Sequence, residues 1–531
     1  MRKTIVMLAA AAMVFGAVSC NKEKETNDLS NRPVRLTATT EGYGDTKTDL
    51  HGHALTWSDG DQIKVMCENF TTADVYQVRE GGSNHAEFVY AGDEANEPTL
   101  VAPFQAGYPA EYWNADVTTI TLPSAQNYVA NGMEKFPMYG EVAEGMGVDF
   151  KNLCGVIRLR LVKPNESVTK IAISTTKYMN GEFGVSFTEG VPAIEHLNGG
   201  DNFITLNCAQ PVSINSATDF YIYLPAGTYN PMRIEVYNNR GLLCEMNSTA
   251  NITIERNKIT TIAPPAESLK FNYVAGLISV SATQQVRFAS GNLQYVRATG
   301  SFQFASSQYE DFQVPYASSS TNNPVLTTDP IVDLFYFSNG TTNNYGADYL
   351  TTSLDVNNFV DWCNALPDNT EGWRTLTSDE WSYAMSSSNN TRKNYWGYAK
   401  ITDESTNTVV RGMVLVPDNW TAPEGFQFKY WGRTQNFTTR YSWEHEWVNQ
   451  YTTEGWKTLE QAGAVFLPCS IEGEAYNGYY WTSNIHNGST TNWDYINVKN
   501  HGTTSSGINH GGTRAMSVRL AQNYEPLTIT E

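Results

Sequence analysis

The order of apolar and polar residues sets the first stretch of the 531-residue chain apart from the rest. Two basic residues precede an apolar run, 5–18, which ends at Ser19 and Cys20. A basic start, a short apolar core and small residues before a cysteine are typical of a lipoprotein signal, since so short a core is not a stable bilayer anchor. We expect residues 1–20 to be a signal peptide and Cys20 to be lipidated. An ordinary secretory signal that is cut nearby is the alternative.

Residues 21–33 are polar and charged, with almost no apolar side chains. Such a segment cannot bury enough apolar surface to offset the conformational entropy that folding costs. We therefore predict a flexible tether between Cys20 and the folded body.

From residue 34 to about 265 the pattern is that of strands separated by turns. Apolar and basic residues alternate along 157–161, which predicts a strand with one buried face and one solvated face. The stretches 220–224 and 232–236 alternate in the same way on either side of a turn at 225–227, so we predict that they pair as antiparallel strands. Because this half has no convincing amphipathic helix, a two-layer β-sandwich is the expected architecture.

Pro264 and Pro265 end this half, because tandem prolines continue neither a helix nor a central strand. Beyond them helical patterns appear, at 355–366 and after Thr377, where Glu380 stands at the spacing of a capping box. Strand patterns then return at 464–467, 479–483, 493–498 and 516–520. The second half is therefore predicted to be α+β.

Charge and composition narrow the function. The formal net charge is -20, which repels phosphate backbones, so no nucleic-acid partner is expected. Six cysteines follow Cys20 without a CxxC pair, and we expect buried free thiols and no zinc site. No GxSxG, Walker or HExxH motif occurs, and His51-Gly52-His53 fits a solvated turn better than a metal site. We predict a non-enzymatic protein without cofactor or metal, which binds a protein or a glycan.

Motifs in the first half resemble those of the fimbrillin-like proteins of Bacteroidetes. They include the segments 55–63 (LTWSDGDQI), 137–139 (PMY) and 150–155 (FKNLCG). The resemblance implies two tandem transthyretin-like β-sandwich domains, at 34–165 and 166–267, in a surface lipoprotein that builds or terminates pili. It also implies that Trp57 and Phe150 are core residues and that Gly60-Asp61 forms a turn.

The region 268–531 is similar to a C-type-lectin-like domain of the kind appended to bacterial surface proteins. The motifs that carry this similarity are 372–381 (GWRTLTSDEW), 463–468 (GAVFLP), 478–483 (GYYWTS) and 516–520 (MSVRL). The calcium-binding tripeptides of sugar-binding members are absent, so we expect recognition without calcium. Cys363 and Cys469 lack the motif of the formylglycine-generating enzymes on this scaffold, which favours a binding role.

Two loop-rich stretches supply candidates for ligand binding, because flat aromatic rings beside polar side chains suit sugar rings and protein contacts. The candidates are His486, Asn487, Asn492, Asp494 and His510, together with Tyr441 and Trp443 in the insertion 420–456. Trp481 and Trp493 are expected in the core instead.

These features lead to one hypothesis and one rival. The hypothesis is a lipid-anchored outer-membrane protein, exposed on the cell surface, that acts as a pilus tip or accessory adhesin and binds an external glycan or protein through its C-terminal domain. The rival is a stand-alone surface lipoprotein that captures polysaccharide.

The fimbrillin-like resemblance further implies strand exchange between pilus subunits after a proteolytic cut that follows an arginine. Arg35 is the candidate, because Pro33 makes Arg32 a poor cut site. We expect such a cut to remove the lipid together with the first strand. Arg35 is equally well explained as an ordinary strand residue.

Overall fold

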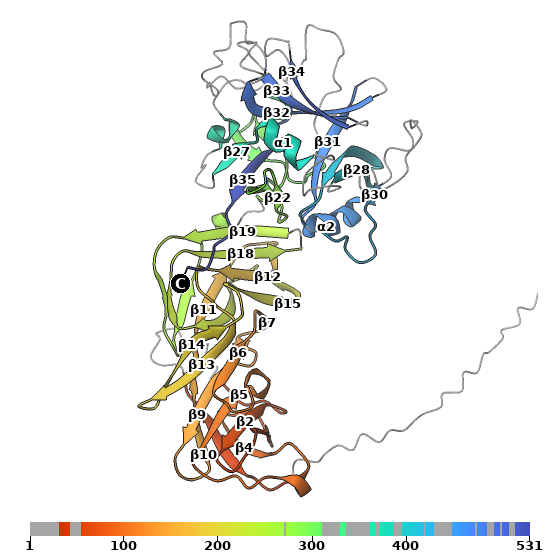
Figure 1. Cartoon of the computed structure of the whole chain (residues 1–531). Helices are drawn as coiled ribbons and strands as arrows, with labels where there is room; N and C mark the ends of the chain where they lie inside the picture. The colour runs from red at the N-terminus through yellow and green to blue at the C-terminus, as the bar shows by residue number, and fades with distance from the viewer. Residues whose placement is uncertain are drawn as a thin grey trace, which may run out of the picture.

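The computed structural model describes most of the chain after the N-terminal 30 residues (Figure 1). The described residues are 31–42, 55–239, 241–269, 272–310, 330–335, 361–366, 372–385, 396–418, 420–429, 449–472, 475–485, 493–499, 502–508 and 516–530.

The described structure is mainly β, as the sequence predicts. Its two described α-helices both lie in the second half of the chain. The strands form an elongated stack: a barrel lies at one end, a two-sheet sandwich in the middle, and the C-terminal region, the described residues from 272 to 524, at the other end (Figure 1).

Seven strands of the first part close into a barrel instead of forming two separate facing sheets. In barrel order they are β1 (Leu36–Thr40), β10 (Gly147–Asn152), β9 (Met138–Val142), β5 (Phe104–Tyr108), β2 (Gln62–Cys67), β3 (Asp74–Val78) and β4 (His85–Tyr90). The first strand, β1, is held on both sides, because it pairs with β10 in parallel and with β4 antiparallel.

Aromatic residues fill the barrel. Trp57 is 1% exposed, and its ring meets Phe88 and Phe150 edge-on at centroid distances of 5.1 and 5.5 Å. The predicted core positions of Trp57 and Phe150 are therefore confirmed. The predicted turn is also present: Gly60 has φ +88°, and the Asp61 carboxylate accepts a hydrogen bond from the Ser58 amide at 2.8 Å.

Two sheets form the middle sandwich. The smaller has the order β16 (Thr218–Pro225), β11 (Cys154–Leu161), β21 (Ile259–Ile262). The larger has the order β19 (Gly241–Ser248), β18 (Met232–Asn238), β12 (Ser167–Ser174), β15 (Phe203–Ser213), β7 (Ala125–Val129), β8 (Gly132–Met133). Strands from both sides of the expected boundary at 165/166 thus share these sheets.

The predicted pairing of 220–224 with 232–236 is wrong. Strand β16 pairs with β11, whereas β18 pairs with β12 and β19 in the other sheet. The intervening turn leads into β17 (Gly227–Tyr229), which pairs with β20 (Ile252–Ile254). Alternation of apolar residues identifies a strand, but the core on which that strand packs selects its partner, and here the chain crosses between sheets.

A hairpin of β13 (Gly181–Thr188) and β14 (Val191–Asn198) lies beside the barrel. It joins the stack because β13 also pairs with β6 (Thr119–Leu122). Its inward-facing residues, among them Phe183, Val185 and Phe187, pack against the barrel core.

The described residues of the C-terminal region form three sheets. One has the order β22 (Ile278–Ser279), β23 (Gln285–Phe288), β35 (Leu520–Tyr524), β27 (Trp373–Thr375), and a second has β25 (Ser301–Phe304), β24 (Leu293–Val296), β26 (Ile331–Val332). The third has β30 (Asn449–Thr452), β28 (Trp396–Asp403), β29 (Thr408–Leu415), β31 (Val465–Glu472), β32 (Ala475–Ile485), β33 (Trp493–Lys499), β34 (Gly502–Ile508). The strands predicted at 464–467, 479–483 and 493–498 lie within this third sheet.

The two described helices are α1 (Ser378–Ala384) and α2 (Thr453–Gln461). The predicted capping box is confirmed at α1, since Thr377 accepts from the Glu380 amide and Glu380 accepts from the Thr377 amide. The other predicted helix, 355–366, lies partly outside the described residues. Its described end is a 3-10 helix, Trp362–Ala365, capped by Asp361.

One prediction for 157–161 needs correction, because the face expected to be solvated contains a buried cation. The Arg158 side chain is 3% exposed and forms an ion pair with Asp219 at 2.6 Å, while Arg160 binds the same carboxylate at 2.7 Å. Burial raises the pKa of Asp219, but the hydrogen bonds from Arg160 and Arg158 outweigh it and lower the pKa to about 2. A charged partner on the neighbouring strand thus allows a basic residue to be buried.

We predict that Asp219→Asn lowers the free energy of unfolding by about 3 kcal/mol at pH 7, because the buried Arg158 loses its counter-charge. The pKa of Asp219 lies below its unfolded value of about 3.9, so its contribution is fully present above that value and is lost as the pH falls toward 2. Urea unfolding should therefore show a difference between wild type and variant that shrinks between pH 4 and pH 2.

The matched control is Glu255→Gln, which removes an exposed pair with Lys258. We expect the control to change stability little at any pH. If the free energies of unfolding of the wild type and of Asp219→Asn differed by the same amount at every pH, the assigned role of Asp219 would be contradicted.

Candidate functional site

Arg35 lies directly before β1, at the edge of the barrel. Its guanidinium binds both carboxylate oxygens of Glu97, and its amide donates to the Phe88 carbonyl at 2.8 Å. The side chain is 38% exposed. A protease can therefore meet this side chain at the surface, but it has to displace the bidentate contact with Glu97.

The expectation that a cut at Arg35 removes the first strand is wrong. Strand β1 begins at Leu36, on the C-terminal side of the cut, and stays paired with β4 and β10. Such a cut would release only the segment that precedes the barrel. Processing after Arg35 itself stays a prediction.

Most of the predicted ligand-binding residues lie outside the described part of the chain. They are His486, Asn487, Asn492, His510, Tyr441 and Trp443, and Cys20 also lies outside it. Asp494 is described, at the start of β33. Its carboxylate accepts a hydrogen bond from the Ser378 hydroxyl at 3.0 Å, and its carbonyl accepts one from Thr482 at 2.8 Å. Asp494 thus connects β33 to α1, and its role in ligand binding stays a prediction.

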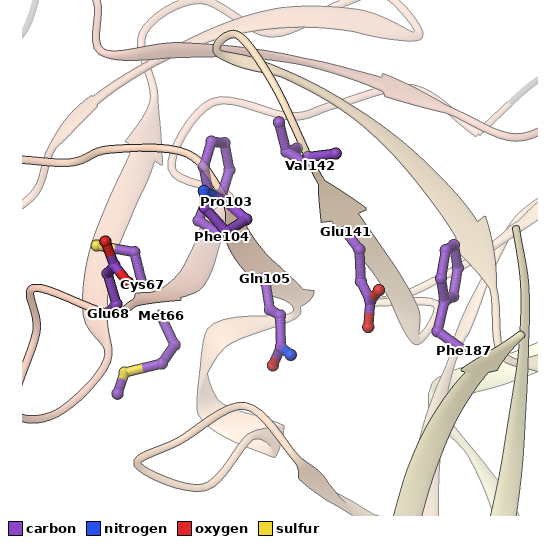
Figure 2. A pocket seen from close by; sticks show the side chains of 10 residues that line it. Met66, Cys67, Glu68, Pro103, Phe104, Gln105, Glu141, Val142 and Phe187 are labelled. Atoms are coloured by element: carbon purple, nitrogen blue, oxygen red, sulfur yellow. The ribbon is translucent and has the colours of Figure 1, made fainter.

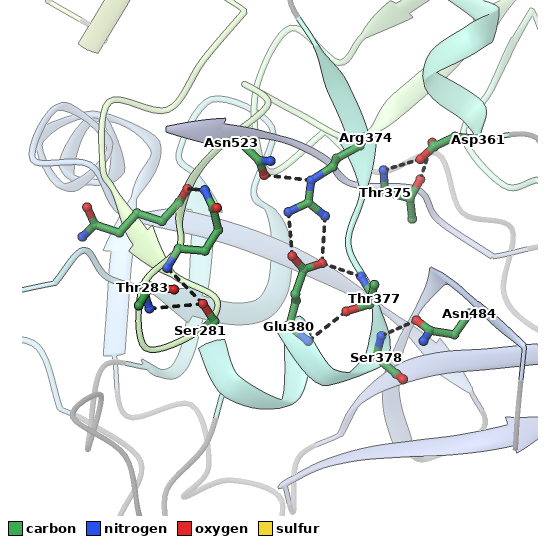
Figure 3. A network of polar contacts seen from close by, with 12 residues as sticks. Ser281, Thr283, Asp361, Arg374, Thr375, Thr377, Ser378, Glu380, Asn484 and Asn523 are labelled. Carbon is green, nitrogen blue, oxygen red and sulfur yellow. Dashed lines mark hydrogen bonds and ion pairs between the residues drawn. The ribbon is translucent and has the colours of Figure 1, made fainter. Parts of the chain in front are cut away.

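The N-terminus of α1 is the centre of a polar network (Figure 3). The Asn484 side chain accepts from the Ser378 amide at 2.7 Å, so β32 satisfies a backbone donor of the helix. Arg374 binds both carboxylate oxygens of Glu380, at 2.6 and 2.7 Å. Burial raises the pKa of Glu380, but the hydrogen bonds from Arg374 and the Thr377 amide outweigh it, and the pKa falls below its usual value.

Trp481 confirms the core interpretation. It is 1% exposed, and its indole N–H donates to the Phe335 carbonyl at 2.7 Å. A fully buried ring whose polar atom is already paired does not contact an external ligand. The side chain of Trp493 lies outside the described part of the structure.

A buried ionic joint connects the sandwich to the C-terminal region. Glu235 on β18 and Glu245 on β19 stand directly opposite each other, and Arg287 of β23 binds both carboxylates. The Arg287 side chain is 4% exposed. Burial lowers the pKa of Arg287, but the two carboxylates outweigh it and the net shift is upward, so the guanidinium stays charged.

Tyr524 completes this joint. Its ring lies between two guanidinium groups, 4.7 Å from Arg233 and 4.6 Å from Arg287, in cation–π contact with both. The chain then runs back along the sandwich: Arg233 donates to the Glu525 carbonyl at 2.9 Å, and the Thr530 amide donates to Thr176 at 2.9 Å (Figure 1). The C-terminal segment therefore straps the last region onto the sandwich.

Apolar residues reinforce the joint. Leu242, from the strand β19 of the sandwich, is fully buried in the core of the C-terminal region, and Tyr237 packs against the same core. A contact that combines a buried core with paired charges holds the two parts in one orientation.

The sequence of β18 contains a signal that one face of this strand is covered, although it does not show which part of the chain covers it. Arg233, Glu235 and Tyr237 alternate with the apolar core residues of β18, on the face that alternation alone assigns to solvent. Clustered charges of both signs on one sheet face, with an aromatic residue among them, are compatible with burial under another part of the chain.

The described residues hold no group of three or more His, Cys, Asp or Glu side chains placed to bind a metal ion. The six described cysteines are free; five are buried, and Cys208 is half-buried, where burial raises its pKa to about 11 and disfavours the reactive thiolate. None of the described helices combines the length and the apolarity that crossing a bilayer would need.

We predict that Arg287→Ala lowers the free energy of unfolding by about 3–5 kcal/mol, because it removes the cation that two opposed buried carboxylates share; Glu245 keeps only its ion pair with Arg233, at 3.5 Å. Thermal unfolding followed by calorimetry should then separate the C-terminal region from the sandwich into two transitions. Arg79→Ala, which removes an exposed ion pair with Glu87, is the matched control and should change stability by less than about 1 kcal/mol. Equal effects of the two variants would contradict the role of the joint.

Comparisons with known proteins give matches only among solved structures, and only at low similarity. No protein-family model matches the chain. No curated protein matches it either. Among solved structures, a candidate cell adhesion protein from Bacteroides ovatus is 14% identical and aligns over 44% of this chain and 93% of its own, with a TM-score of 0.30.

Two further solved structures are fimbrial proteins. One, from Bacteroides ovatus, is 10% identical and aligns over 93% of this chain and all of its own, with a TM-score of 0.23. The other is the tip fimbrial protein Mfa3 from Porphyromonas gingivalis, with a C-terminal truncation; it is 12% identical and aligns over 44% and 85% of the two chains, with a TM-score of 0.19. Values this low do not assign the chain to a family.

Proposed function

We propose that this chain is a non-enzymatic adhesin of the cell surface that is lipidated on Cys20 during export, loses this anchor by a cut after Arg35, and is associated with a pilus. In this proposal the C-terminal region is the part that meets an external glycan or protein. The lipoprotein-like start of the sequence and the fimbrillin-like motifs of its first half support the surface location.

The ionic joint is the observation that carries the proposal. An adhesin has to keep its binding region at a fixed distance and orientation from its attachment, and to resist pulling between the two. The described chain begins at the barrel, and the C-terminal region lies at the opposite end of the stack (Figure 1). Arg287, Tyr524 and the returning C-terminal segment hold that region to the sandwich at several points. Together these contacts suit the transmission of force from a terminal binding region to an anchored base.

Immunogold electron microscopy with an antibody against residues 268–531 tests pilus association. We expect gold particles on pili, and at their ends if the protein is a tip adhesin. Label confined to the cell body would instead favour the stand-alone polysaccharide-binding lipoprotein. A strain without the gene serves as the control for antibody specificity.

N-terminal sequencing of the protein extracted from the cell surface tests processing after Arg35. We expect the mature chain to begin at Leu36, and expect this product to be lost in Arg35→Gln. Arg32→Gln is the matched control, because Pro33 protects the bond after Arg32, and it should leave processing unchanged. A lipidated Cys20 at the start of all extracted chains would contradict processing at this site.

A further inference from the structure

The outer surface of the barrel carries a groove of about 550 Å³ between its wall and the β13–β14 hairpin (Figure 2). Three neighbouring strands, β2, β5 and β9, supply most of its lining, and Phe187 of β13 stands at one side. A volume of this size lies within the range of about 300–1,000 Å³ that is usual for ligand pockets. The groove is remote from the C-terminal region, so it is distinct from the predicted ligand-binding residues there.

Strand register explains which side chains face the groove. Met66 of β2 stands opposite Gln105 of β5, which stands opposite Glu141 of β9. Because side chains alternate across a sheet, these three residues form one row on the outer face, and each is at least partly exposed. Their neighbours Cys67, Phe104 and Val142 form the corresponding row on the inner face and are buried. The groove floor is therefore built into the barrel wall.

In the next row of the same outer face, where Gly107 stands opposite Tyr139, aromatic side chains cover the barrel wall. Trp113 stacks on Tyr139 at 5.4 Å, and Phe187 meets Tyr139 edge-on at 5.6 Å. Trp113 also lies directly over Gly107, where a Cβ atom would come within 2.3 Å of the indole. Only glycine permits this close cover, so the aromatic residues are held in place and end the groove on that side.

The groove combines an apolar and aromatic lining with negative charge. Glu141 stands in the central row, and its carboxylate accepts a hydrogen bond from the Tyr139 hydroxyl at 2.8 Å. Glu68, directly after β2, adds a second carboxylate. None of the ten residues that line the groove is Lys or Arg. Figure 2 shows the Glu141 carboxylate between Gln105 and Phe187.

We propose that this groove binds a basic side chain, Arg or Lys, of a protein partner, with an apolar neighbour of that side chain packed on Met66. A cation placed here would pair with the Glu141 carboxylate and could reach the face of the Phe187 ring. The aliphatic stem of such a side chain would cover the thioether and the barrel wall. The net charge of -20 on the whole chain would also speed the approach of a basic partner. This binding surface is independent of the proposed role of the C-terminal region.

The test measures fluorescence anisotropy of a labelled pentapeptide, Ala-Leu-Arg-Leu-Ala, with the full chain. The comparison peptide carries citrulline, the uncharged analogue of arginine, in the central position. We expect the arginine peptide to bind about tenfold more tightly than the citrulline peptide. We also expect Glu141→Gln to lower the affinity for the arginine peptide about tenfold. Gln105→Lys, which places a cation in the same row, should abolish binding of this peptide.

Glu87→Gln, on β4 of the same barrel, is the matched control and should leave peptide binding unchanged. Melting temperatures of all variants show whether the barrel is intact, since the substituted side chains lie at its surface. Equal affinity for the two peptides, failure of both to bind, or no effect of Glu141→Gln would overturn the proposal. Binding of maltohexaose that is lost in Gln105→Lys, without binding of the peptide, would also overturn it and assign the groove to glycans.

Discussion

Two carboxylates that face each other across neighbouring strands constrain how this molecule is assembled. Glu235 and Glu245 stand opposite each other on β18 and β19, where like charges repel and burial would be costly. Arg287, from the sheet that follows, binds both carboxylates and is itself buried, and Arg233 pairs with Glu245 at 3.5 Å. Burial of the two glutamates without Arg287, or of Arg287 without the glutamates, would leave charges without their partners and would be costly. The sandwich and the C-terminal region therefore depend on each other, and Tyr524 and the returning C-terminal segment add further contacts to the same place.

This dependence links architecture to the proposed role. The barrel, where the described chain begins, and the C-terminal region are separated by the length of the sandwich, and the ionic joint keeps the second at a defined orientation (Figure 1). The barrel carries its own surface feature, the acidic groove, because one outward-facing row of its wall, Met66, Gln105 and Glu141, stays partly exposed, whereas Trp113, Tyr139 and Phe187 close the next row. In the proposed role one molecule offers two separated binding surfaces, one at each end of the stack, and the ionic joint between the sandwich and the C-terminal region limits their relative movement.

Much of the secondary structure is readable from the sequence, since it depends on local patterns. The capping box at Thr377 and Glu380 and the core positions of Trp57, Phe150 and Trp481 are confirmed. Errors arise where a residue's surroundings come from distant parts of the chain. Arg158 alternates like a solvated residue, yet it is buried because Asp219 lies on the next strand. Of the predicted site residues, Arg35 and Asp494 are described, and both take part in hydrogen bonds that their neighbours in sequence do not reveal.

The mainly β class, the change of pattern after Pro264-Pro265 and many of the core residues can be predicted from the sequence, because strand periodicity and residue size act over a few positions. Three features depend on contacts between distant parts of the chain: β16 and β18 belong to different sheets, β1 begins after Arg35 and is paired on both sides, and Arg287 binds two glutamates some 40 to 50 positions earlier. The pairing of strands, the closure of the barrel and the burial of charged side chains depend on which surfaces of the chain meet in space. Many partners have a compatible local pattern, and the packed core selects among them.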